Sequence, residues 1–147
     1  MNIEDPETNP SQQLGTFIQL AKANTDEGWV AIDKQLAEHC NDPEFLIWAR
    51  ANTANEESVL RDLAATIFER TDAPLDKEDV SKLMILMREI DSDNPYPSFR
   101  AACALAKRPD NQGIKEVLGE VKAKLQSFID DEDVSEIASQ YLDELGA

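Results

Sequence analysis

The residues of this chain best suited to chemistry are His39 and Cys40, which are adjacent at the end of an expected helix. His39 is the single histidine, and Cys40 is one of two cysteines. A cysteine nucleophile needs a histidine base within hydrogen-bond reach. Neighbouring residues of an α-helix project about 100° apart and do not face each other. We therefore expect His39 to stabilise the helix C-terminus and Cys40 to face the core.

A dense group of acids near the C-terminus is the main candidate for binding a partner. Acids at the start of a helix stabilise its positive end by about 0.3–1 kcal/mol each when exposed. The same acids could instead contact a basic protein, whose charge they would complement. Both interpretations stay open. The candidate residues are Asp130, Asp131, Glu132, Asp133 and Glu136.

A second acidic segment, Asp91 to Pro95, begins like a calcium-binding loop. Such a loop requires a further Asp or Asn, then Gly, then a distant Glu. Pro95 and Tyr96 break that pattern, so the segment predicts a helix-capping turn. The glycines are isolated and form no phosphate-binding loop. We expect no catalytic residue, no cofactor and no metal site, and a protein that is not an enzyme.

The chain is acidic along its whole length. Its net charge is −16, from 30 acids and 14 lysines and arginines. Residues 1–75 carry 14 of the acids and residues 76–147 carry 16, so the acidity is not confined to a tail. Such a surface repels nucleic-acid phosphates and attracts basic proteins. A role in solubility alone is the alternative.

The N-terminal residues are acidic and polar, so no secretory signal is expected. No apolar run approaches the roughly 20 residues that span a membrane. Two cysteines without a paired framework favour a reducing, cytoplasmic setting.

Apolar residues recur at helical spacing along most of the chain, which predicts eight helices separated by short turns. The segment Asn24-Thr25-Asp26 is expected to form a turn and cap, Asp42, Asn55 and Asp76 are expected to cap helices, and Pro43 to occupy a first helical position. The expected helices cover about 11–23, 27–40, 43–54, 55–70, 76–90, 95–108 and 114–128, and a last one runs from Asp130 or Asp131 to near Leu145.

Three of these helices share one pattern. Segments that begin at Asn55, Asn94 and Ile129 align without gaps, 39 and 35 residues apart. That spacing is typical of helical-repeat arrays. The aligned apolar columns are Leu60/Phe99/Val134, Leu63/Ala102/Ile137, Ala64/Cys103/Ala138 and Ile67/Ala106/Tyr141.

The pattern resembles HEAT repeats and the related bacterial armadillo-like repeats over about residues 43–145. The second helix of such a repeat opens with a turn Asp or Asn, then an apolar residue followed by Arg, then small residues. Leu60-Arg61 and Phe99-Arg100 fit this pattern, whereas the third segment has Ser135 in place of the Arg. In the family that Arg ties adjacent repeats through turn carboxylates. The resemblance therefore implies structural roles for Arg61, Arg100, Ala64, Cys103 and Ala138.

We expect an all-α fold, a short α-solenoid of about four antiparallel helical hairpins (a HEAT-like superhelix). Residues 1–10 would form a flexible lead-in and 11–147 a single helical-repeat domain, with repeat-like hairpins at about 43–70, 76–108 and 112–145. A compact, non-repetitive bundle is the structural alternative.

Helical-repeat arrays usually bind proteins, so we expect a non-enzymatic protein–protein interaction module. One form would be an acidic inhibitor or immunity-type protein that binds a basic partner. The alternative is a scaffold or adaptor subunit of a larger assembly, with an apolar patch around Trp48, Tyr96 or Tyr141. A small enzyme with an unfamiliar site is a third hypothesis, for which the sequence offers no candidate residues.

Overall fold

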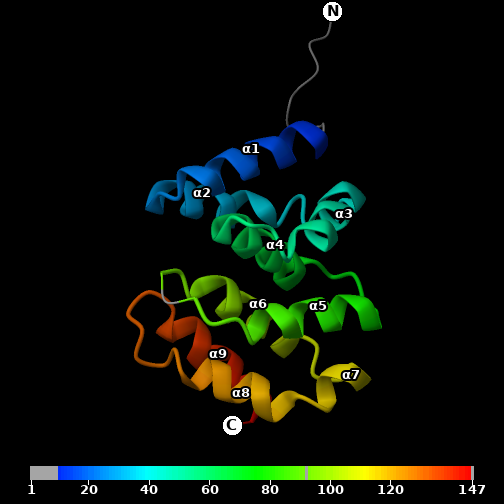
Figure 1. Ribbon diagram of the computed structural model, residues 1–147, viewed down its shortest axis with the longest axis vertical. Coiled ribbons are helices and arrows are strands. Elements are labelled where there is room, and N and C mark those ends of the chain that lie inside the picture. The colour runs from blue at the N-terminus through cyan, green and yellow to red at the C-terminus, as the bar shows by residue number, and fades with distance from the viewer. Residues whose placement is uncertain (1–9, 92, 147) are drawn as a thin grey trace, which may run out of the picture. The chain divides into compact units, whose positions relative to one another are not determined.

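The computed structural model describes residues 10–91 and 93–146, and every regular element within these ranges is a helix (Figure 1). The all-α prediction is confirmed. The expected lead-in over 1–10 lies outside the described residues except for Pro10. The helices are α1 (Pro10–Ala23), α2 (Asp26–Leu36), α3 (Pro43–Asn52), α4 (Ser58–Arg70), α5 (Lys77–Met87), α6 (Tyr96–Ala106), α7 (Gln112–Lys115), α8 (Leu118–Gln126) and α9 (Ser135–Leu145).

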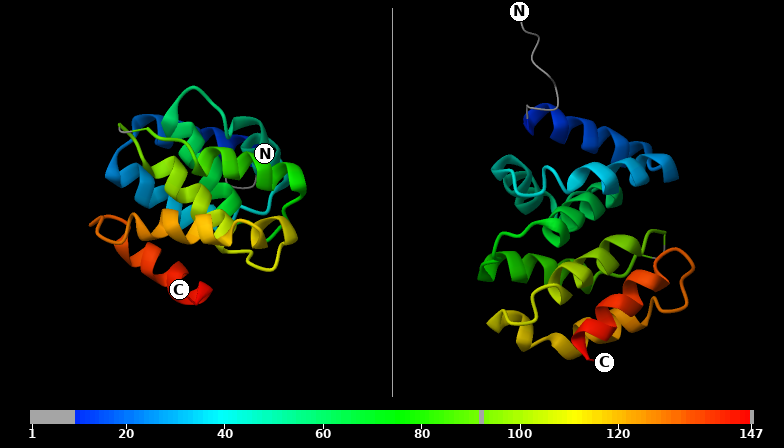
Figure 2. Two further views of the ribbon diagram at one scale, coloured as in Figure 1. Left: turned by 60° about the horizontal axis from the view of Figure 1, so that its bottom comes forward. Right: turned by 180° about the vertical axis from the view of Figure 1, so that it is seen from behind.

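The chain divides into two compact units between Ala73 and Pro74, in the segment that joins α4 to α5. In unit 1, α4 packs on α3 and α1, and α2 packs on α1. In unit 2, α6 packs on α5 and α8, and α9 packs on α8 and α6 (Figure 2). Helices that follow one another in the chain are thus packed in pairs inside each unit. A single repeat domain over 11–147 stays a prediction.

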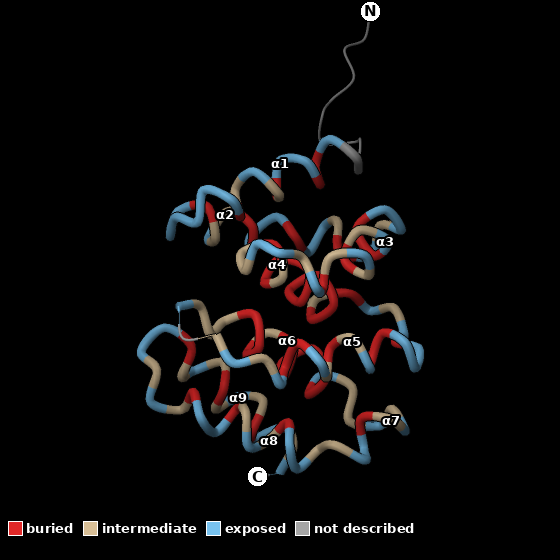
Figure 3. The backbone as a smooth tube through the Cα atoms, viewed as in Figure 1, coloured by how far each residue is buried: buried red, intermediate tan, exposed pale blue. Residues whose placement is uncertain are grey.

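Each unit contains one helix that is buried along most of its length (Figure 3). In α4 every residue from Leu60 to Glu69 is buried except Arg61, and in α6 every residue from Pro97 to Ala106 is buried except Arg100. Small side chains let neighbouring backbones approach such a helix closely, since large ones would hold them apart. The small residues expected at these contacts, Ala64 and Cys103, are both 0% exposed.

Several predicted helix starts are confirmed. The Thr25 hydroxyl caps α2 by accepting a hydrogen bond from the Gly28 amide at 3.0 Å. Asp76 caps α5 and forms a reciprocal capping box with Asp79. Pro43 occupies the first turn of α3, where its missing N–H costs nothing.

The predicted cap at Asn55 is wrong. Helix α4 begins at Ser58, with Glu57 at the N-cap position. The Asn55 side chain instead accepts a hydrogen bond from the Glu57 amide at 2.7 Å. The Asn55 side chain is used in this local turn and is not available to cap the helix, so α4 starts later.

The last two predicted helices also differ from the structure. The helix expected around 114–128 is divided into α7 and α8, because the Val117 amide bonds to Ile114, three residues back, in place of four. The final helix begins at Ser135, and neither Asp130 nor Asp131 caps it. The Asp131 side chain accepts from the Asp133 amide at 2.9 Å, which delays the helix in the same way as at Asn55.

Replacing Ala64 with leucine should lower the free energy of unfolding by about 1–3 kcal/mol, because the fully buried site has no room for the added carbons. Urea unfolding measures the change. Ala51→Leu, at an exposed position of α3, is the control and should be nearly neutral. Equal stability of wild type and Ala64→Leu would show that Ala64 is not at a tight helix contact.

Candidate functional site

The acidic residues singled out in the sequence lie in the loop between α8 and α9 and at the start of α9. A second acidic loop joins α5 to α6, and both loops lie at the same end of unit 2 (Figures 1 and 2). We call residues 91, 93, 94 and 130–136 the acidic end. Asp130, Glu132 and Glu136 are exposed, and their side chains have no hydrogen-bond or ion-pair partner among the described residues.

Tyr96, the first residue of α6, connects the two loops. Its hydroxyl lies 3.3 Å from Asp131 Oδ2 and 3.2 Å from Asp133 Oδ2, within reach to donate its proton to either carboxylate. The Tyr96 amide donates to the Asn94 side chain at 3.2 Å. The side chain of Tyr96 therefore fixes the α8–α9 loop, while its backbone fixes the α5–α6 loop.

The ring of Tyr96 packs against an aromatic cluster. Its ring lies 6.4 Å from that of Phe128, which in turn lies 4.8 Å from the fully buried ring of Phe99. Phe128 ends the segment after α8, so packing in the core sets where the acidic loop begins. The loop position thus depends on both an apolar and a polar contact.

The environment of Tyr96 raises the pKa of its phenol to about 12. Burial is the largest cause, and the negative charge of Asp131 and the hydrogen bond to Asp133 add to it. Each cause disfavours the phenolate, because ionisation would place a third negative charge beside two carboxylates and remove the donated proton.

The dipole of α9 accounts for only some of the acids in and after the α8–α9 loop. Glu136 lies in the first turn of α9. Residues 130–133 precede the helix, since its N-cap position is Val134. Asp131 and Asp133 hold Tyr96, which leaves Asp130 and Glu132 without a structural role in the described contacts.

No positive charge offsets this end within the segments that form it. Residues 126–146 carry seven acids and neither lysine nor arginine, and residues 89–99 carry three acids and neither base. The bases of unit 2 occur in other segments, among them Arg88, which forms a bidentate ion pair with Glu120 of α8. The segments that form the acidic end therefore contribute negative charge and no positive charge of their own.

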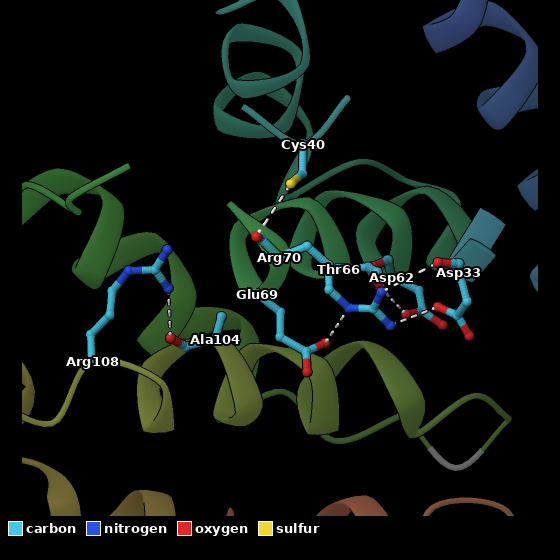
Figure 4. A network of polar contacts seen from close by, with 8 residues as sticks. All are labelled: Asp33, Cys40, Asp62, Thr66, Glu69, Arg70, Ala104 and Arg108. Atoms are coloured by element: carbon cyan, nitrogen blue, oxygen red, sulfur yellow. Dashed lines mark hydrogen bonds and ion pairs between the residues drawn. The ribbon is translucent and has the colours of Figure 1, made fainter. Parts of the chain in front are cut away.

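His39 and Cys40 make separate contacts. His39 Nδ1 lies 3.2 Å from Asp42 Oδ2, and its ring stacks on Phe45 at 5.7 Å. The Cys40 thiol donates to the Arg70 carbonyl at 3.3 Å (Figure 4). The Asp42 side chain thus pairs with His39 and makes no cap hydrogen bond to α3.

These contacts belong to a set that fixes the C-terminus of α4. Arg70 Nη2 donates to Asp33 Oδ1 of α2 at 2.9 Å (Figure 4). The Asn41 side-chain oxygen accepts from the Thr71 hydroxyl at 2.9 Å and from the Asp72 amide at 2.8 Å. Residues 33–41 are in this way joined to the end of α4, which gives them a role in the architecture of unit 1.

The repeat-type arginines lie at equivalent positions near the starts of α4 and α6. Arg61 Nη1 donates to the carbonyls of Asn55 and Glu56, at 2.7 and 3.2 Å, and so holds the turn before its own helix. The Arg100 guanidinium lies 5.8 Å from the centre of the Phe99 ring. Ala138, the third small residue, is 0% exposed. That the arginines tie adjacent repeats together stays a prediction.

The aromatic residues proposed for an apolar patch are only partly exposed. Trp48, Tyr96 and Tyr141 all have intermediate exposure. Among the residues that the structure describes, the exposed large apolar side chains are instead Val30, Ile47, Ile85 and Ile90.

Within residues 10–91 and 93–146, no three His, Cys, Asp or Glu side chains are grouped as a metal site would require. None of the helices in these ranges is long and apolar enough to cross a membrane. No family model, curated protein or solved structure matches the chain. The likeness to HEAT repeats therefore remains a resemblance in sequence pattern.

Tyr96 is the residue of the site whose role the sequence did not reveal. It stood out only as a partly apolar side chain and as a break in a calcium-like loop. A tyrosine at the start of a helix, one repeat before a run of acids, is a signal that would have suggested the contact. Its 35-residue separation from Asp131 matches the repeat spacing.

Replacing Tyr96 with phenylalanine should lower the free energy of unfolding at pH 8 by about 1 kcal/mol, the typical value of one hydrogen bond. The phenol ionises near pH 10 in the unfolded chain and near 12 in the folded chain. Its stabilising contribution is therefore complete below pH 10 and is lost as the pH rises from 10 to 12.

Urea unfolding at pH 8, 9, 10 and 11 measures this effect, with Tyr141→Phe as the control. Wild type and the control should lose stability above pH 10 more steeply than Tyr96→Phe. Identical slopes in all three proteins would contradict the assigned contact.

Proposed function

We propose that this protein is a non-enzymatic interaction module that binds a basic protein through its acidic end. An inhibitor or immunity-type protein is the form that fits best. The observation that carries the proposal is the pair of acidic loops held together by Tyr96, with no base in either segment. Exposed acids with no internal partner, such as Asp130 and Glu132, keep their charge available to another molecule.

Electrostatics supports a basic protein as the partner class. A net charge of −16 raises the rate at which a basic protein encounters this one, and the effect weakens as salt screens the charges. A preorganised patch adds orientation to this general attraction, because its loops need not be ordered on binding. The Tyr96 contacts supply that preorganisation.

The architectural part of the proposal is a short α-solenoid of helical hairpins, similar to HEAT repeats. Its support is the repeated apolar pattern and the packing of consecutive helices as pairs inside each unit. A cytoplasmic location is part of the same proposal. Two buried free thiols, Cys40 and Cys103, suit a reducing compartment.

The triple variant Asp130→Asn, Glu132→Gln, Glu136→Gln tests the acidic end. It removes three negative charges and leaves the carboxylates that hold Tyr96 in place. Tagged full-length protein is used to capture binders from lysate of its native cells at 50 and 500 mM salt, with identification by mass spectrometry. We expect a basic protein that is retained by wild type at low salt and at least about tenfold less by the triple variant.

The matched control is Glu38→Gln, Glu56→Gln, Glu116→Gln, which removes the same charge from exposed positions outside the acidic end. It should retain the partner as wild type does. Equal loss of the partner in both variants would show that net charge alone, and not the acidic end, determines binding. A partner retained by all three proteins at high salt would overturn the proposal in favour of an apolar interface.

A further inference from the structure

One face of α5 is exposed along the whole helix. Its residues are spaced three, four and three apart, so they share one side of the helix. The two ends of this face are charged, and a large apolar side chain lies between them. That side chain, Ile85, is 70% exposed. The four residues of this face are Glu78, Ser81, Ile85 and Arg88.

The surface beside this face is hollow. A groove of about 660 Å³ lies between α5 and α7, and Ser81, Met84 and Val117 are among the residues that line it. Ser81 belongs both to the exposed face and to the groove. A protruding isoleucine and a small residue beside a groove thus lie one turn apart on the same helix.

We propose that the α5 face binds a second copy of this chain, with the two α5 helices antiparallel and the two-fold axis crossing the exposed face midway between Ser81 and Ile85. A two-fold interface places residue i against residue j and j against i, so one surface must complement itself. About this axis Ile85 of each copy faces Ser81 of the other, beside the groove. Each protruding Ile85 therefore meets a small residue that lines the groove.

The charges on the face complement each other in the same arrangement. Glu78 of one copy faces Arg88 of the other, so opposite charges meet at both ends of the helix pair. Arg88 contacts Glu120 through Nε and Nη2, which leaves Nη1 to reach a carboxylate of the second copy. A parallel arrangement would instead set Glu78 against Glu78 and Arg88 against Arg88.

The antiparallel direction also limits the repulsion between two acidic proteins. The loop 91–94 follows the C-terminal end of α5, so the antiparallel pair places the acidic loops of the two copies at opposite ends of the helix pair. Like charges are then kept apart along the length of the interface.

Sedimentation equilibrium of the full chain over a wide concentration range tests the dimer. We expect a monomer–dimer equilibrium in wild type and a dissociation constant at least about tenfold weaker in Ile85→Arg, which buries a charge in place of an apolar side chain. Ile47→Arg is the matched control, since Ile47 is 65% exposed on α3. It should dimerise like wild type.

A cross-link tests the register. The single variants Ser81→Cys and Ile85→Cys are mixed under mild oxidation; the native cysteines are buried. The mixed disulfide between the two variants should form faster than either symmetrical one, because only positions 81 and 85 face each other.

A wild type that stays monomeric at every concentration would overturn the proposal, as would a dimer that survives Ile85→Arg or a preference for the symmetrical disulfides. These outcomes are independent of the test of the acidic end. Ile85→Arg leaves residues 130–136 unchanged, and the lysate capture measures binding of another protein and not self-association. Either proposal can fail while the other stands.

Discussion

The hydroxyl group of Tyr96 is the contact on which the proposed binding surface depends. It joins the start of α6 to the loop before α9 and so brings two acidic segments, 35 residues apart, to one end of unit 2. The neutral phenol can hold two carboxylates close together only while it keeps its proton, and the raised pKa shows that the folded chain favours that form. The Tyr96 hydroxyl thus fixes Asp131 and Asp133 in the α8–α9 loop without any partner molecule.

The position of Tyr96 follows in turn from the burial of α6. A helix buried along most of its length must use small side chains where its neighbours approach, which accounts for the alanines and Cys103 of α6 and for the alanines of α4. Phe99 then anchors Phe128, and Phe128 sets the start of the acidic loop. Apolar packing places the loop, and the Tyr96 hydroxyl fixes its conformation.

Sequence reasoning succeeded where the interactions are local. Helical periodicity revealed the all-α fold, and the caps within residues 24–26 and at Asp76 were predictable because the capping side chain bonds three residues ahead. It failed at Asn55 and Asp131, because a bond to the amide two residues ahead competes with capping and has the same local sequence signal. The contact between Tyr96 and Asp131 was not predicted, because the repeat spacing alone does not specify how α6 packs on α8 and α9.

The most direct test of this account is to map where a cationic probe contacts the full-length, ¹⁵N-labelled protein by NMR, using a lysine-rich synthetic peptide at low salt. The account predicts that amide shifts concentrate in residues 91–96 and 130–136 and vanish at high salt. In Tyr96→Phe, whose acids are unchanged, the same peptide should bind more weakly. Shifts spread evenly over exposed acids in both units, or a Tyr96→Phe variant that binds as tightly as wild type, would contradict the claim that an ordered acidic end is the binding surface.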